Sequence, residues 1–104
     1  MHLEPTMKQA VIRRTVRRFA QNTLAPAAVE MDATGDFSWE AAHSMAALQY
    51  FGLEAPHEHG GAGLDPISYA VVIEEISRAN AAMGLCVAVH NGVAVAPLLD
   101  FGTE

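Results

Sequence analysis

A long apolar stretch near the C-terminal end limits the folds that are open to this chain. From residue 81 to about residue 101 the pattern predicts one helix that is apolar nearly all round, with Asn80 as its N-cap. Its larger apolar residues and its cysteine are Met83, Leu85, Cys86, Val87, Val89, Val93, Val95, Leu98 and Leu99. A helix without a polar face has to be buried in a protein core or in lipid.

The position of polar residues decides between these two surroundings. A membrane span needs about twenty apolar residues without polar groups at its centre. His90 and Asn91 lie near the centre of this stretch, and amphipathic helical patterns precede it. We therefore expect no membrane span but a core helix, kinked at Pro97, with the other helices wrapped around it.

The first predicted helix begins at a capping box formed by Thr6 and Gln9. Its apolar residues keep helical spacing as far as Met31, and the helix should finish before the turn-forming run of residues 32–36. Pro26 lies inside this pattern. Because proline lacks a backbone N–H and clashes with the preceding turn, we expect a kink or a restart there.

Two more helices complete an all-α bundle of about four main helices. Ser38 is a suitable N-cap for the second helix, and Trp39 and Tyr50 give bulk to its buried face. Asp65 and Pro66 begin the third helix. We expect a buried stripe on the third helix, with three charged residues facing water or a partner; the stripe is Tyr69, Val72, Ile73 and Ile76, and the charged residues are Glu74, Glu75 and Arg78.

An ordered glycine-rich loop, residues 52–65, is predicted between the second and third helices. Gly52 can end the second helix in the left-handed conformation, and Pro56 keeps Ala55 out of the helical region. Residues 53–56 are expected to be extended, with room for one short strand. Three glycines within the next few residues allow backbone angles that are closed to other residues.

Charge is distributed unevenly along the chain, whose formal net charge is −6. Lys8 and four arginines precede Glu30, where the only acid is Glu4, and the rest is acidic apart from Arg78. The arginines cover one side of the first helix, which indicates either a solvated face or a docking face for an acidic partner. The overall acidity excludes a nucleic-acid-binding domain. A single cysteine fits a reducing compartment.

The candidate chemical motifs lack the residues or the spacing of the functional sites that they suggest. Residues 60–63 lack the Lys-Ser/Thr of a phosphate-binding loop, and Asp65 places a negative charge where phosphate would lie. His57 and His59, with His43 or His90 as a third ligand, do not have the spacing of a metal site. We therefore expect no metal site and no catalytic residue. His90 and Asn91 are expected either to satisfy backbone groups of the loop or to line a pocket.

Several motifs in order along the chain resemble the opening of the acyl-CoA dehydrogenases. They are VRRFA (16–20), LAP (24–26), FSWE (37–40), the loop GLEAPHEHGGAGLD (52–65), SYA (68–70), EEISR (74–78), HN (90–91), Pro97 and FGTE (101–104). His59 departs from the family pattern, which commonly has a tyrosine before the paired glycines. The resemblance covers nearly the whole chain after about residue 10.

The resemblance implies a three-part enzyme of which residues 1–104 are the N-terminal helical domain, without the central β domain and the C-terminal helical domain. Such enzymes oxidise an acyl-CoA at Cα–Cβ with FAD, and electron-transferring flavoprotein reoxidises the flavin. The catalytic base and most flavin contacts lie outside this region, so we expect the chain alone to be inactive and not to bind FAD stably. By resemblance, Val89, His90 and Val93 contribute to the acyl-pocket wall.

The same resemblance implies a homo-oligomer in the bacterial cytoplasm, or in the mitochondrial matrix if the source is eukaryotic. An alternative of a different class is a free-standing helical interaction module that has the fold without catalysis. The reading frame beyond Glu104 distinguishes the two hypotheses, because only the enzyme needs a β domain and a second helical bundle.

Overall fold

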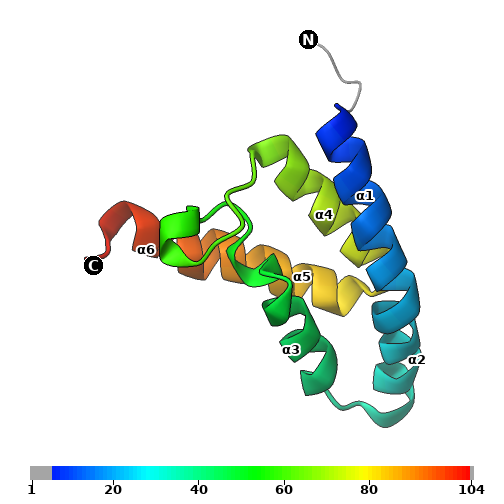
Figure 1. Cartoon of the computed structure of the whole chain (residues 1–104). Coiled ribbons are helices and arrows are strands. Elements are labelled where there is room, and N and C mark those ends of the chain that lie inside the picture. Colours follow the sequence, from blue (N-terminus) through cyan, green and yellow to red (C-terminus); the bar gives the residue numbers. More distant parts are fainter. Residues whose placement is uncertain (1–5, 104) are drawn as a thin grey trace.

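The computed structural model describes residues 6–103, and this part of the chain is helical without a strand (Figure 1). Two long helical stretches each contain a central π turn. The first consists of α1 (Met7–Phe19), η1 (Ala20–Leu24) and α2 (Ala25–Thr34), and the second of α5 (Ala81–Val89), η4 (His90–Val95) and α6 (Ala96–Phe101). Between them lie α3 (Trp39–Ala47), the short 3₁₀ turns η2 (Tyr50–Gly52) and η3 (His57–His59), and α4 (Pro66–Ala79). The all-α prediction with about four main helices is confirmed.

The predicted helix starts are confirmed at the level of individual hydrogen bonds. In the Thr6–Gln9 capping box, the Thr6 N–H donates to Gln9 Oε1 (2.9 Å) and the Gln9 N–H donates to Thr6 Oγ1 (3.2 Å). The side chains of Ser38, Asp65 and Asn80 each accept a backbone N–H three residues later. Short polar side chains at these positions satisfy donors that a helix leaves unpaired. Glu4 and Glu104 lie outside the described residues.

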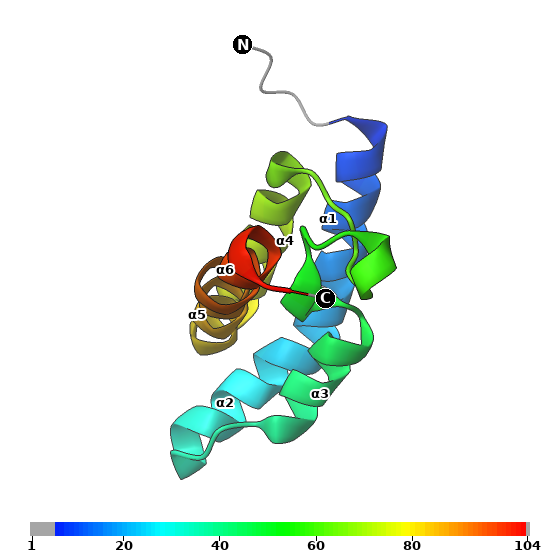
Figure 2. The same ribbon diagram turned by 90° about the vertical axis from the view of Figure 1, so that its left-hand side faces the viewer.

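Both prolines inside the long helices follow a π turn. The Ala25 N–H donates to the Ala20 carbonyl and the Ala96 N–H to the Asn91 carbonyl, and Pro26 and Pro97 come next. In a regular α-helix Pro26 would clash with the Asn22 carbonyl and leave it without a donor. In the π turn each N–H bonds to the carbonyl five residues back instead of four, so the hydrogen-bond register changes just before each proline. Between α1 and α2 the helix changes direction (Figure 2), as the kink prediction required.

The predicted end of the first helix is wrong by three residues. α2 continues through Asp32 to Thr34, and Gly35 ends it in the left-handed conformation with φ 75°.

The end of the second helix also differs from the prediction. Gly52 does not end it in the left-handed conformation: α3 stops at Ala47, and Gln49 takes that conformation with φ 66°. The Gln49 side chain donates to the Gly60 carbonyl (3.3 Å), which ties this backbone reversal to the glycine-rich loop. Residues 53–56 do not form the short strand, since Leu53 is helical in φ and ψ. The helix ends early because its last N–H groups bond three residues back, in a tightened turn.

The glycine-rich loop is ordered, as predicted. It folds back on itself through backbone bonds from Ala62 to Gly52 (2.9 Å), from Gly63 to Ala55 (2.9 Å) and from Leu64 to Leu53 (2.8 Å). At Gly61 a Cβ atom would lie only 2.2 Å from the Ala55 carbonyl oxygen, so no other residue fits without a shift. The two sides of the loop can therefore approach closely enough to bond.

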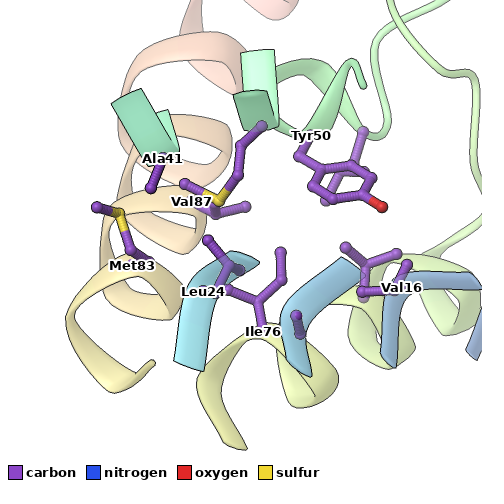
Figure 3. Close-up of a cluster of buried hydrophobic side chains, with 11 residues drawn as sticks. Val16, Leu24, Ala41, Tyr50, Ile76, Met83 and Val87 are labelled. Carbon is purple, nitrogen blue, oxygen red and sulfur yellow. The ribbon is translucent and has the colours of Figure 1, made fainter. Parts of the chain in front are cut away.

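The core lies where α1, η1, α3, α4 and α5 meet (Figure 3). Its fully buried side chains include Leu24, Met45, Leu53, Ile76, Met83 and Val87. Two predictions about faces are wrong. Trp39 is 68% exposed rather than part of the buried face, and Glu75 is buried instead of facing water or a partner. In the predicted stripe of α4, Val72 and Ile76 are buried, and Tyr69 and Ile73 are half-buried.

The helix Ala81–Phe101 is not enclosed by the others, which corrects the expectation of a central core helix. It is long and apolar enough to cross a membrane by length and composition alone, with a mean hydropathy of 1.7, and 22% of that stretch is buried. One side of α5 packs on α4 through Met83, Gly84 and Val87. The opposite side is open, and α6 projects from the body of the molecule (Figure 1).

Candidate functional site

The long C-terminal helix has an exposed apolar surface on the side of α5 and η4 that faces away from α4. Val89 and Val93 are 48% and 70% exposed, and Leu85, four residues before Val89, is 65% exposed. Residues at this spacing share one side of a helix. At Gly92 a Cβ would meet no atom within 4 Å, so the surface beside it is open. We call Leu85, Val89 and Val93 the apolar face.

The sequence analysis does not assign Leu85 to the acyl-pocket wall, although its spacing from Val89 and Val93 is the signal that could have identified it. The sequence pattern made the whole helix apolar, so it did not distinguish the side that packs from the side that stays open. Only the placement of α4 against Met83 and Val87 separates the two sides.

His90 lies beside this face but turns toward the loop. Its ring packs edge-on against Phe51 with 5.1 Å between ring centroids, and Nδ1 lies 2.9 Å from the Phe51 carbonyl oxygen. A carbonyl oxygen only accepts, so Nδ1 carries the proton. The residue remains exposed, and Nε2 is the nitrogen that this bond does not occupy.

Asn91 is buried and anchors the same loop to the helix. Its Oδ1 accepts the Leu53 N–H (2.9 Å), and its Nδ2 donates to the carbonyls of Tyr50 (3.0 Å) and Val87 (2.9 Å). Both residues bond backbone groups of the loop, as predicted, but only Asn91 is buried as the prediction also required, whereas His90 is exposed. We call His90 and Asn91 the loop latch, since together they hold residues 50–53 on η4.

A hollow of about 550 Å³ continues beyond the latch, between the loop and α6. Val95, Leu98 and Leu99 line its helical side, and Ala55 and His59 line its loop side. The loop latch therefore fixes the distance between two walls, one from the glycine-rich loop and one from the C-terminal helix.

A second cluster of charged residues joins α1 to α4. Arg17 Nε and Nη2 donate to the two oxygens of Glu75 (2.9 and 2.8 Å), and Arg13 Nη1 donates to Oε1 (2.7 Å). Two weaker ion pairs lie at the edge of this cluster. Glu74 Oε1 is 3.4 Å from Arg13 Nη1, and Arg78 Nη1 is 3.7 Å from Glu75 Oε1. The two hydrogen bonds from Arg17, followed by the one from Arg13, lower the pKa of Glu75 to about 2 against the opposing effect of burial. Part of the arginine face thus binds an acid of its own chain.

The remaining candidates from the sequence do not form a site in the part of the chain that the structure describes. No group of three or more His, Cys, Asp or Glu side chains there is arranged to hold a metal ion. At the start of α4 the Asp65 carboxylate accepts the Ser68 N–H (2.7 Å), so the helix N-terminus already holds an anion. Every buried side-chain nitrogen and oxygen of residues 6–103 has a hydrogen-bond partner.

A family model and two relatives of this chain carry the name acyl-CoA dehydrogenase. The family model described as "Acyl-CoA dehydrogenase, N-terminal domain" matches residues 6–104. The acyl-CoA dehydrogenase of Bacillus subtilis is 40% identical over 104 residues, which is 100% of this chain and 27% of that protein. The mitochondrial short-chain specific acyl-CoA dehydrogenase of Mus musculus is 37% identical over 93 residues, which is 89% of this chain and 23% of that protein.

A solved structure has the same fold as this chain. A chain described as the electron transferring flavoprotein of Acidaminococcus fermentans, in connection with flavin-based electron bifurcation, matches with a TM-score of 0.92 and 30% sequence identity. The match covers 100% of this chain and 27% of that chain. The present chain therefore spans about a quarter of the length of the proteins that it matches.

Proposed function

The chain belongs to the acyl-CoA dehydrogenase family, and from this we propose that it is the N-terminal helical domain of a longer enzyme that dehydrogenates an acyl-CoA thioester between Cα and Cβ. The match covers residues 6–104 of this chain but about a quarter of its curated relatives. In this proposal a central β domain and a C-terminal helical domain complete the active site.

The observation that carries the proposal is the apolar face of α5 and η4. Leu85, Val89 and Val93 expose apolar side chains in a row, and Gly92 leaves space beside them. An acyl chain requires a wall of this chemistry, because each methylene group that leaves water contributes about 0.8 kcal/mol. His90 borders this wall, with its Nδ1 already bonded to Phe51.

The flavin belongs to the proposed enzyme, but this chain supplies little of its site. In residues 6–103 no buried polar side-chain atom lacks a partner, so these residues have no preformed buried donor set for a flavin. The chemistry that a flavin held by the other domains would supply is acceptance of the hydride from Cβ of the substrate. We assign the base that removes the Cα proton to the part of the enzyme outside this chain, and the chain alone is expected to be inactive.

The partners follow from the same proposal. They are an acyl-CoA as substrate, electron-transferring flavoprotein as the electron acceptor, and further copies of the enzyme in a homo-oligomer. A bacterial enzyme of this kind would act in the cytoplasm, and a eukaryotic one in the mitochondrial matrix.

A chimaeric enzyme tests the proposal. This chain replaces the matching 104 residues of the Bacillus subtilis relative, with which it is 40% identical. The chimaera is expected to hold FAD and to reduce an artificial electron acceptor with an acyl-CoA, whereas the 104-residue chain alone should show no turnover. A chimaera that folds and binds FAD but does not oxidise any acyl-CoA would contradict the proposal and favour an interaction module.

A further inference from the structure

An exposed aromatic pair lies at the turn between α2 and α3. The rings of Phe37 and Trp39 pack edge to face, with 4.9 Å between their centroids, yet the residues are 39% and 68% exposed. Exposed aromatic residues are enriched where proteins bind each other, because they bury a large area with few rotatable bonds. The apolar face described above does not include this pair.

Two hollows flank the pair, and carboxylates surround it. Met31, Asp36 and Phe37 line both hollows, of about 480 and 220 Å³. Glu30, Asp32, Asp36 and Glu40 are all exposed around them, and none of the four forms an ion pair within residues 6–103. We call Phe37, Trp39 and these four carboxylates the acidic aromatic patch.

The complementary surface is present on the same chain. On the outer side of α1, Met7 and Val11 are 81% and 48% exposed, and Arg14 and Arg18 follow at the spacing of a single helix face. Lys8 lies beside them. In the described residues Arg14 and Arg18 form no ion pair, whereas Arg13 and Arg17 are bound to Glu75. We call Met7, Lys8, Val11, Arg14 and Arg18 the basic face.

We propose that the acidic aromatic patch of one copy binds the basic face of a second copy. Each surface combines apolar side chains with charges of one sign, and the two signs are opposite, so that head-to-tail contact buries apolar area and pairs charges. The two surfaces lie toward opposite ends of the molecule (Figures 1 and 2), which leaves both accessible. An anionic membrane surface does not fit the patch, because its carboxylates would be repelled.

The single tryptophan of the chain makes the contact measurable in the wild-type protein. As protein concentration rises in low salt, the fluorescence emission of Trp39 should shift to shorter wavelength and the sedimentation coefficient should rise in parallel. Both changes should be lost in high salt, because exposed charges are screened over about 3 Å at 1 M ionic strength. Self-association that is equally strong in high salt, or that leaves Trp39 emission unchanged, would overturn the proposal.

Charge reversal with rescue tests the assignment of the two surfaces. Arg14→Glu/Arg18→Glu and Asp32→Lys/Asp36→Lys are each expected to weaken self-association by about tenfold or more, since repulsion replaces two exposed attractions. An equimolar mixture of the two variants should regain association. The intact acidic aromatic patch of the arginine variant can bind the intact basic face of the aspartate variant, and the two reversed surfaces also have opposite charges. Glu54→Lys, an exposed reversal outside both surfaces, should have no effect.

The apolar face supplies the competing route to self-association. Val93→Ser should leave the salt-sensitive association unchanged if the proposal holds. If Val93→Ser abolishes association, or if the mixed charge variants fail to associate while both retain the helical circular dichroism of the wild type, the acidic aromatic patch is not the contact.

Discussion

At the scale of single residues, Glu75 shows how a buried charge is accommodated in this domain. Its side chain is 2% exposed and accepts hydrogen bonds from Arg13 and Arg17, whose side chains are 31% and 45% exposed. A buried carboxylate is tolerated when its oxygens are bonded and its charge is paired. The arginines therefore join α1 to α4 as well as keeping Glu75 ionised.

Removal of this charge should destabilise the chain. We expect Glu75→Gln to lower the free energy of unfolding by about 2 kcal/mol, because two guanidinium groups lose the paired charge and an NH₂ donor replaces one of the two acceptor oxygens. Glu74→Gln is the matched control, since its side chain is 55% exposed, and it should change stability by less than about 0.5 kcal/mol. Equal effects in urea unfolding would contradict the role given to Glu75.

The same carboxylate gives a pH signature. The pKa of Glu75 is lowered from 4.5 to about 2, so its contribution is complete above a pH of about 4.5 and is lost as the pH falls toward 2. The stability difference between the wild type and Glu75→Gln should therefore shrink over that interval. A difference that stays constant from neutral pH to pH 2 would show that the ion pair is not its source.

The sequence did not identify this cluster, and the reason is physical. Helical periodicity indicates which residues share a side of α1 or of α4, but not which sides meet. Arg13 and Arg17 were placed on a face that either is solvated or binds an acidic partner, and Glu75 on an exposed one. Their contact spans about 60 residues of sequence and exists only because α1 packs on α4.

At the scale of elements, the glycine-rich loop depends on one close approach. Gly61→Ala should lower stability by about 2 kcal/mol or more, since its Cβ would lie 2.2 Å from the Ala55 carbonyl oxygen. Gly92→Ala is the control, because a Cβ there meets nothing within 4 Å and alanine favours a helix by about 1 kcal/mol. Thermal unfolding should separate the two variants in opposite directions, and similar midpoints would contradict the loop geometry.

The loop latch should control the order of the loop. In Asn91→Ala the Leu53 N–H loses its acceptor, and we expect a loss of about 2 kcal/mol together with faster hydrogen exchange at that amide. Asn22→Ala, at an exposed position of the other π turn, should change neither. Unchanged exchange at Leu53 in Asn91→Ala would show that the latch does not hold the loop.

Helix boundaries were predictable wherever a capping residue is present. Thr6, Ser38, Asp65 and Asn80 each begin a helix as their side-chain chemistry indicates. The end of α3 was not predictable, because glycine is the expected left-handed residue and Gln49 takes that conformation through its bond to Gly60. Long-range contacts of this type override local preference.

At the scale of the whole molecule, the family and the all-α class were accessible from motifs and periodicity, whereas the exposure of the longest apolar helix was not. An apolar pattern predicts that Leu85, Val89 and Val93 leave water, but it does not say whether this domain or another body covers them. In the structure of residues 6–103 these side chains stay 48% to 70% exposed. This is the surface to which the proposed function assigns the acyl chain.

The substrate profile of the chimaeric enzyme tests this assignment most directly. Val93→Trp should lower kcat/KM for the longer acyl-CoA substrates by about tenfold or more relative to the shortest one, because the larger ring fills the space beside Gly92. Val29→Trp, at a valine of α2 that is 72% exposed, should leave the profile unchanged. If Val93→Trp and Val29→Trp give the same chain-length profile, the apolar face does not line the acyl pocket.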